Sequence, residues 1–349
     1  MNYITLASSF FLTAISLLAL RPFATRVGLV DIPGGRKTHE VPTPLVGGLG
    51  IYLGTLLIAV FTPSVIAHYG AMLALSALVL FIGILDDAFE LKVVARMGGH
   101  AVAALLMATV AGVQLENLGD LVGLGDVHLG MLSVPLTVFA TVGVINAINM
   151  ADGLDGLSGG LVLIALTCIG FTSLMAGNLT LLSFVVILSC AVIAFLSMNF
   201  RLLWKKRAMI YLGDSGSTML GFILAWLLID STQGPAPVFK PVFALWFIAI
   251  PLIDTVFLLA SRPLRGLSPF NPGIDHLHHN LIKQGLDTKT TVLLMYAGAL
   301  TFGVIGLIGF VMQVAEGFMF LAFLALFGFY LYVGQVLGRL NHTGRSSRR

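Results

Sequence analysis

Long apolar stretches separated by short polar segments run through the whole chain. A membrane-spanning helix needs about 20 apolar residues, and eleven stretches approach that length. They are Tyr3–Leu20, Leu45–Phe61, Gly70–Leu85, Met97–Val113, Met131–Ile148, Leu157–Met175, Leu179–Phe200, Tyr211–Ile229, Val242–Ala260, Thr291–Met312 and Phe318–Leu337. No soluble domain is inserted between them. The pattern predicts an all-α polytopic membrane bundle of about eleven transmembrane helices, forming a single domain over residues 1–349.

The basic residues are distributed asymmetrically about these stretches. If the stretches alternate across a membrane, every Lys and Arg of the 19 in the chain except Lys240 falls on one side. Short cytoplasmic loops are enriched in Lys and Arg, so we expect an N-terminus outside and a C-terminus in the cytoplasm. No basic residue precedes the first stretch and no small-residue cleavage site follows it, which favours a retained span over a signal peptide.

Composition agrees with this topology. The chain is 58% hydrophobic and 10% charged, with a mean hydropathy of +0.99, whereas soluble domains carry roughly 25% charged residues. The net charge of +3 is small and its basic residues are spread over several loops, so we expect no nucleic-acid partner. Cys168 and Cys190 lie in apolar stretches and are expected to pack as free thiols, with a disulfide as the alternative.

The first polar cluster is the pair Asp86 and Asp87 at the expected cytoplasmic end of the third stretch. Adjacent carboxylates repel each other unless a cation or a proton lies between them. Magnesium prefers oxygen ligands and is commonly shared between carboxylates and substrate phosphates. A metal site is therefore one interpretation, and a solvated helix end is the other.

A second cluster lies between the fifth and sixth stretches, in the segment that contains Asn149, Asp152 and Asp155. The two aspartates are three residues apart, so on a helical turn they share a face. The loop has no cation of its own, although cytoplasmic loops are usually basic. This favours a functional acid pair over a structural turn.

Asp214 lies at the entry to the eighth stretch, after Gly213. An aspartate at this position can simply cap the helix. The free N–H groups and the dipole of a helix N-terminus also favour bound anions. A phosphate site and a plain helix cap are therefore both open.

Histidines and basic residues complete the polar set. His276, His278 and His279 lie in the longest cytoplasmic loop, where we expect contacts to phosphate. Zinc is the alternative for clustered histidines, but the other candidate ligands are acids that suit a harder cation. Lys37 and His39 lie beside a Pro- and Gly-rich turn and suit a lipid phosphate, with topological charge as the alternative.

Asp254 lies inside the ninth stretch. An intramembrane carboxylate is a functional candidate by default, but its separation in sequence from the loop clusters favours a packing or hydrogen-bonding role. A transporter would place charges near the membrane midplane, and Asp254 is the one candidate for that class. Acids for a divalent cation and bases for phosphate, all on one face, instead indicate phosphoryl transfer from a nucleotide-linked donor to a lipid phosphate.

The chain resembles the polyprenyl-phosphate N-acetylhexosamine-1-phosphate transferase superfamily, glycosyltransferase family 4. The similarity covers nearly the whole length and is carried by VGLVDIPGGRKTHEVPTPLVGG, FIGILDDAFEL, INAINMADGLDGLSGG, MIYLGDSGSTMLGF, ALWFIAIPLIDT and LSPFNPGIDHLHHNLI. The histidine motif has the H-x-H-H form, which resembles the motif of the branch that uses UDP-N-acetylglucosamine and undecaprenyl phosphate. The branch that transfers muramyl-pentapeptide has three consecutive histidines instead.

This resemblance implies an activity and a location. The expected reaction transfers N-acetylglucosamine-1-phosphate from UDP-N-acetylglucosamine to undecaprenyl phosphate, releasing UMP, as the first membrane step of O-antigen or common-antigen synthesis. It implies Mg²⁺, with Mn²⁺ as an alternative, a bacterial inner-membrane location with a cytoplasmic active site, and a homodimer. Another UDP-N-acetylhexosamine, such as a deoxy sugar or muramyl-pentapeptide, is the alternative donor.

The resemblance also assigns roles to individual residues. Catalytic roles fall on Asp86, Asp87, Asp152 and Asp155, and metal binding on Asp214 with Asp87. Substrate binding falls on Lys37, His39, Asn149, Asn199, Tyr211, Arg265, His276, His278 and His279, with Tyr211 at the place of an aromatic residue that stacks on uracil. Glu90 departs from the pattern, since close relatives often have Asp there, which argues against a metal role at that position.

Overall fold

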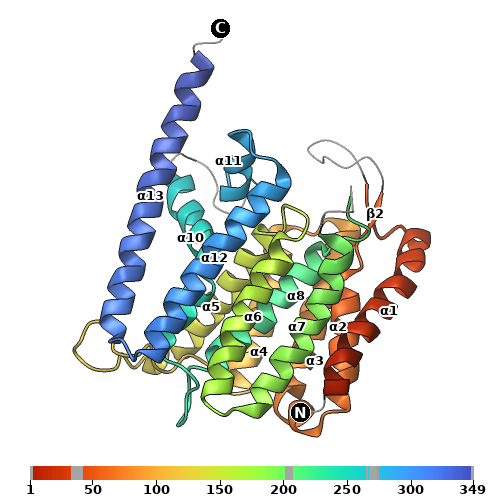
Figure 1. The fold of residues 1–349 in the computed structure, drawn as a ribbon, viewed down its shortest axis with the longest axis horizontal. Coiled ribbons are helices and arrows are strands. Elements are labelled where there is room, and N and C mark those ends of the chain that lie inside the picture. Colours follow the sequence, from red (N-terminus) through yellow and green to blue (C-terminus); the bar gives the residue numbers. More distant parts are fainter. Residues whose placement is uncertain are drawn as a thin grey trace.

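The computed structural model describes residues 3–32, 42–200, 207–264, 266, 273 and 275–346. Within these ranges the chain is a bundle of α-helices with one small β-hairpin (Figure 1). The helices are α1 (Tyr3–Val27), α2 (Gly47–Val60), α3 (Pro63–Phe89), α4 (Val93–Thr109), α5 (Ser133–Met150), α6 (Leu157–Met175), α7 (Leu179–Asn199), α8 (Gly213–Asp230), α9 (Pro241–Phe247), α10 (Ala249–Leu264), α11 (Leu277–Lys283), α12 (Thr288–Val311) and α13 (Glu316–Ser346), with a short 3₁₀ helix at Gly130–Leu132.

The all-α prediction is confirmed, and each of the eleven apolar stretches lies on a helix or on a pair of helices. Six helices are long and apolar enough to cross a membrane, namely α1, α3, α5, α6, α7 and α12. A seventh crossing is added if the bent pair α9 and α10 counts as one. The apolar parts of α2, α4 and α13 are shorter, so a count of eleven crossings stays a prediction, as does the side on which each terminus lies.

The ninth apolar stretch is broken, contrary to the single straight helix expected over Val242–Ala260. Helix α9 ends at Phe247, α10 starts at Ala249, and their axes differ by 88°. Pro251 stands four residues after Phe247 and has no N–H to donate to its carbonyl. The helical hydrogen-bond ladder therefore cannot continue through this point, and α10 begins a new direction.

Helix α8 is the centre of the bundle. Its residues from Ser215 to Ile229 are all buried, and α2, α3, α5 and α6 pack around it. A Cβ atom on Gly83 would lie 2.3 Å from the Cα of Ser215, and one on Gly48 would lie 2.3 Å from the Cα of Gly216. These glycines let α3 and α2 touch the backbone of the first turn of α8, which puts the end of α3 beside the start of α8. Cys168 and Cys190 are free thiols, as predicted.

The segment that leads into α8 is held by the β-hairpin. Strands β1 (Val30–Asp31) and β2 (Thr43–Pro44) are antiparallel. The Tyr211 N–H donates to the Pro44 carbonyl at 2.8 Å, and the Gly47 N–H donates to the Tyr211 carbonyl at 2.9 Å. In Figure 1 the hairpin and α11 lie at the same end of the bundle, while the first turn of α1 lies at the opposite end. The polar motifs therefore gather at one end.

Candidate active site

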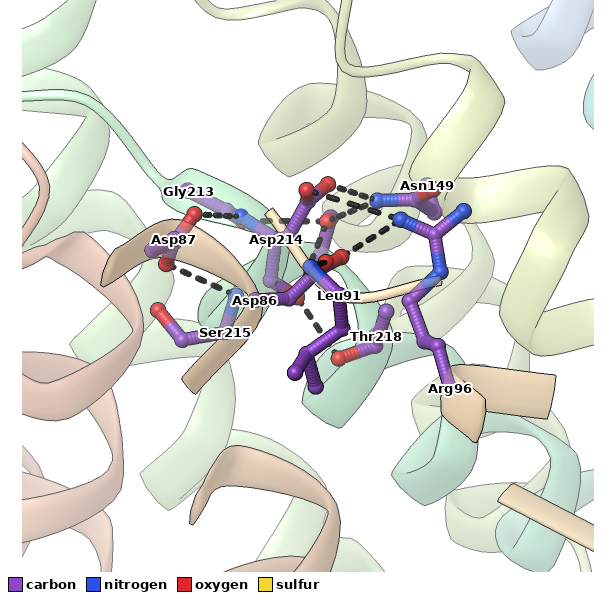
Figure 2. Close-up of polar contacts among 10 residues, drawn as sticks. Asp86, Asp87, Leu91, Arg96, Asn149, Gly213, Asp214, Ser215 and Thr218 are labelled. Atoms are coloured by element: carbon purple, nitrogen blue, oxygen red, sulfur yellow. Dashed lines mark hydrogen bonds and ion pairs between the residues drawn. The ribbon is translucent and has the colours of Figure 1, made fainter. Parts of the chain in front are cut away.

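Asp87, in the last turn of α3, lies against the N-terminus of α8. Its Oδ1 accepts the Asp214 N–H at 2.8 Å and its Oδ2 accepts the Ser215 N–H at 3.1 Å (Figure 2). The first N–H groups of a helix have no partner within it, and a carboxylate there is stabilised by the dipole. Gly213 has a φ of +75°, and a Cβ at that position would lie 2.6 Å from Asp87 Oδ2. Asp87 thus joins α3 to α8 through the backbone.

Asp86 points the other way and is buried. Its Oδ2 accepts a hydrogen bond from Arg96 Nη1 at 2.5 Å, and its Oδ1 accepts the Leu91 N–H at 2.8 Å. Helix α3 ends here, with exposed Glu90 in the left-handed region at φ 48°. Asp86 therefore fixes the turn from α3 to α4, and its expected catalytic role stays a prediction.

Asp214 has a partly solvent-exposed carboxylate. Asn149 Nδ2, at the end of α5, donates to Asp214 Oδ1 at 2.5 Å and to Ser217 Oγ at 2.9 Å. Arg96 Nη1 lies 3.6 Å from Asp214 Oδ2. The Asp214 side chain is 40% exposed, whereas that of Asp86 is 4% exposed. In Figure 2 the Asn149 amide and the Arg96 guanidinium both face the Asp214 carboxylate, so the predicted meeting of these motifs is observed.

The loop after α5 adds further negative charge. Burial, and then the nearby carboxylates of Asp214, Asp87 and Asp155, raise the pKa of Asp152 well above its usual range. The carboxylates of Asp152, Asp155, Asp87 and Asp214 are thus close enough to repel one another. Among the ion pairs of the described residues, Arg96 is the cation that pairs with Asp86 and Asp214. A hard divalent cation with oxygen ligands would relieve this repulsion, so the donor chemistry fits Mg²⁺.

In the described part of the chain, no three His, Cys, Asp or Glu side chains are spaced to hold a metal ion by themselves. Magnesium is commonly bound through one or two carboxylates, with waters and substrate phosphates completing its shell. The residues present are therefore suited to a cation that arrives with a phosphorylated substrate.

The loop that contains Asp152 and Asp155 is held at Gly156. Asn199 Oδ1 accepts the Gly156 N–H at 2.6 Å, and Asn199 Nδ2 donates to the Ile210 carbonyl at 2.9 Å. Tyr296, on α12, donates its hydroxyl to the Gly156 carbonyl at 2.5 Å. Asn199 thus uses both polar groups on the backbone, and its expected contact with substrate stays a prediction. Sequence reasoning missed Tyr296, which reads only as an aromatic residue in an apolar helix.

The histidine motif meets the same loop. His278 is 1% exposed, and neither of its ring nitrogens has a hydrogen-bond partner among the described residues. A Cβ on Gly153 would lie 2.3 Å from His278 Nε2. Burial, followed by the charges of His279 and His276, lowers the pKa of His278 to about 3, so this imidazole is neutral near pH 7. The structure therefore brings a neutral ring with unpartnered nitrogens to the acidic loop.

Asp254 belongs to this motif, which corrects the expectation that it lies apart from the loop clusters. Its Oδ2 is 2.9 Å from His276 Nδ1, and its Oδ1 accepts the Leu277 N–H at 3.0 Å. Residues 276 and 277 fold back against α10, which sequence separation alone does not reveal. Arg262 Nη2 and Nε bind Asp275 in a forked ion pair at 2.5 and 3.2 Å. The expected hydrogen-bonding role of Asp254 is confirmed.

Some predicted residues cannot be placed in the same way. Lys37, His39 and Arg265 lie outside the described residues, and their expected phosphate contacts stay predictions. Tyr211 is half-buried beside Leu45, with which it forms a parallel β-bridge. Its expected stacking on uracil also stays a prediction.

Comparison with known proteins places this site in a family. The pattern of glycosyl transferase family 4 matches residues 69–232, the segment from α3 to α8. The chain is 35% identical over 336 residues to the undecaprenyl-phosphate alpha-N-acetylglucosaminyl 1-phosphate transferase of Yersinia pestis. This match covers 95% of the chain and 92% of the relative. The chain belongs to glycosyl transferase family 4. The resemblance inferred from its motifs is confirmed.

Other relatives with the same name support this membership. The protein from Escherichia coli K12 is 35% identical over 337 residues, with 95% of this chain and 92% of the relative covered. That from Haemophilus influenzae is 36% identical over 318 residues, with 91% and 90% covered. Together with its apolar helices, these relatives identify the chain as a multi-pass membrane transferase of phospho-sugars.

Proposed function

We propose that the protein transfers N-acetylglucosamine-1-phosphate from UDP-N-acetylglucosamine to undecaprenyl phosphate at the cytoplasmic face of a bacterial inner membrane. The products are undecaprenyl-diphospho-N-acetylglucosamine and UMP, and the lipid product would begin a surface glycan of the O-antigen or common-antigen type. The observation that carries the proposal is the meeting of Asp87, Asn149, Asp152 and Asp214 at one end of the apolar bundle. The names of the relatives support the choice of substrates, and the bias of basic residues supports the face.

The cluster suits the binding of a pyrophosphate with its cation. Asp214 and Asp87 would hold Mg²⁺, or Mn²⁺ in its place. When bound, this ion neutralises charge on the donor pyrophosphate and orients it for displacement. Asp214 is the accessible member of the pair, while Asp87 keeps it in place by binding the Asp214 N–H. Asn149 holds one oxygen of the Asp214 carboxylate, which fixes the direction in which the other oxygen points.

The lipid phosphate would act as nucleophile. One of its oxygens attacks the phosphorus that carries the sugar, and the bond to the UMP phosphate breaks. Since a phosphate monoester is mostly ionised near neutral pH, it needs little help from a base. Positioning and electrostatic stabilisation should supply most of the acceleration. The neutral imidazole of His278 can contribute an uncharged hydrogen bond to the donor.

Direct attack is favoured over a phospho-aspartyl intermediate. Both oxygens of Asp87 already accept backbone N–H groups, and Asp86 is paired with Arg96. Carboxylates that are held in this way are poorly placed to attack phosphorus themselves. A phosphorylated aspartate trapped at either position in the absence of lipid acceptor would contradict direct attack.

The decisive experiment uses purified protein, UDP-N-acetylglucosamine with a labelled sugar, undecaprenyl phosphate and Mg²⁺. We expect labelled lipid and an equal amount of UMP, with both lost when either the lipid phosphate or the metal is omitted. UMP release that does not depend on lipid would contradict the transfer reaction. A parallel screen of other UDP-N-acetylhexosamines, including the muramyl-pentapeptide and deoxy donors, tests the sugar separately. Cross-linking in membranes would test the expected homodimer.

A further inference from the structure

Asp254 is a buried carboxylate on an apolar helix with an unusually complete set of partners. Its Oδ1 accepts the Leu277 N–H at 3.0 Å and the Tyr330 hydroxyl at 2.7 Å, while Oδ2 faces His276 Nδ1 at 2.9 Å. A buried ionisable group within a membrane protein is costly and is usually kept for function. These contacts join α10, α11 and α13 at a single side chain.

The partners of Asp254 decide which nitrogen of His276 carries a proton. Two groups that can only donate in this geometry already occupy Oδ1, and an ionised carboxylate has no proton to donate from Oδ2. His276 Nδ1 must therefore be the donor in its contact with Oδ2. The ring is held in one orientation, with Nε2 as its second hydrogen-bonding atom.

The fixed ring is linked to the acidic loop by direct contact. The rings of His276 and His278 are stacked, with an interplanar angle of 13° and centroids 5.6 Å apart. His278 in turn packs on Gly153, next to Asp152. A change in the orientation of His276 would therefore move the stacked His278 ring, which contacts the acidic loop at Gly153.

We propose that Asp254 is a positioning residue for the transfer reaction, which fixes the Nδ1-protonated form of His276 and keeps the stacked pair of His276 and His278 against the Asp152 loop. It acts on the nucleotide-sugar donor through His276 without touching the donor itself. The kinetic part of this inference rests on the proposed function, whereas the protonation of His276 does not.

The substitution Asp254→Asn tests the proposal with little change in shape. An asparagine Oδ1 can still accept from Leu277 and Tyr330, but its NH₂ group would face His276 Nδ1 with a donor. The imidazole must then move its proton to Nε2 or rotate away. Hydrogen-bond partners that orient metal-bound histidines are typically worth about 10- to 100-fold in activity. We expect a fall of that order in kcat/KM for the UDP-sugar here, while KM for the lipid phosphate is unchanged.

Two comparisons separate this role from a general structural one. In a His276→Ala background, Asp254→Asn should change kcat/KM by less than about twofold, because residues that act through one another are not additive. Tyr330→Phe removes one donor to Oδ1 but leaves the contact with His276, so it should cost less than about threefold. An undiminished effect of Asp254→Asn without His276, or an equal loss in Tyr330→Phe, would overturn the proposal.

Nitrogen-15 spectra of histidine-labelled protein in lipid give a readout that does not require turnover. We expect a protonated Nδ1 for His276 in the wild type and a protonated Nε2 in Asp254→Asn. An unprotonated Nδ1 in the wild type would overturn the proposal even if the variant failed to fold. If the wild type shows the expected Nδ1 signal but no transfer from UDP-N-acetylglucosamine, the proposed function fails while the assignment of His276 stands.

Discussion

The acidic cluster (Asp86, Asp87, Asp152 and Asp214) and the histidine cluster (His276, His278 and His279) are neighbours that differ in how far their polar atoms are satisfied. In the acidic cluster, Asp86 is held by Arg96 and a backbone N–H, and Asp87 by two backbone N–H groups. The neutral ring of His278, by contrast, is buried, and neither of its nitrogens has a hydrogen-bond partner in the part of the chain that the structure describes.

This difference indicates what each cluster requires from a substrate. The carboxylates are well positioned but repel one another, so they need positive charge. The His278 ring carries no charge, and its buried nitrogens have no partner among the described residues, so it needs hydrogen-bond partners. The proposed nucleotide-sugar, bound with a divalent cation, would supply both, with the cation at the acids and polar oxygens at the ring. The following variants test that division, from the largest expected effect to the smallest.

Asp214→Asn should remove the main metal-binding charge from the acidic cluster. Loss of the several kcal/mol that a metal ion contributes to charge stabilisation corresponds to a fall in kcat of about 10³-fold. Asp230→Asn, at the other end of the same helix and paired with His68 at 3.3 Å, is the matched control and should keep activity within about twofold. Mg²⁺-dependent transfer at the wild-type rate by Asp214→Asn would contradict the metal assignment.

Gly83→Ala should displace the acidic cluster without altering any acid. The added Cβ would lie 2.3 Å from the Ser215 backbone, so α3 must move away from α8 and Asp87 must lose its contact with the Asp214 N–H. We expect a loss of about 1–3 kcal/mol in stability and, since a displacement near 1 Å can cost that much, about 10²-fold in activity. Thermal denaturation and single-turnover assays would measure the two effects.

Gly70→Ala is the control for that variant, because it lies on the same helix and its Cβ would be 3.8 Å from the nearest side-chain atom, in Ile66. It should keep full activity and gain up to about 1 kcal/mol from helix propensity. Equal behaviour of Gly70→Ala and Gly83→Ala would show that the close approach of α3 to α8 has no functional role.

Gly153→Ala should separate the two clusters from each other. Its Cβ would lie 2.3 Å from His278 Nε2, which forces the buried ring out of its place while leaving the contacts of Asp87 and Asp214 intact. We expect KM for the UDP-sugar to rise by about 10-fold, the cost of roughly one hydrogen bond, with Mg²⁺ dependence unchanged. Gly143→Ala, which meets nothing within 4 Å, is the control. An altered Mg²⁺ optimum in Gly153→Ala would show that the clusters do not act separately.

Asp152→Asn should affect stability in a pH-dependent way when divalent metal is removed. The folded pKa of Asp152 is raised above the unfolded value of ~3.9, so its ionisation opposes folding. This opposition is absent well below pH ~4 and grows as the pH rises through the folded pKa. In EDTA the variant should therefore melt about 2 °C above the wild type near pH 8 and together with it near pH 4. A difference that grows toward acid pH would contradict the raised pKa.

Much of the helical framework follows from sequence because hydrophobic length is a local property. The same holds for the acids, since Asp87, Asn149, Asp152 and Asp214 stand at helix ends, where charge must lie outside the apolar interior. The residues missed are those whose roles depend on distant partners. Tyr296 contacts Gly156, and Asp254 contacts His276, across sequence separations that no periodic pattern of residues reveals. The break at Ile248 was also missed, since proline in an apolar stretch predicts a kink but not its 88° angle.

The enclosure of α8 has a consequence for how the enzyme works through a reaction cycle. A helix surrounded on every side by tightly packed neighbours cannot shift without disturbing the whole interior. Asp214 lies in the first turn of that helix, so we expect its backbone to keep one position while other parts of the site move. In the proposed reaction, the adjustments that admit a donor or release UMP would then come from segments at the edge of the bundle, such as the short helix α11 and the loop at Gly153.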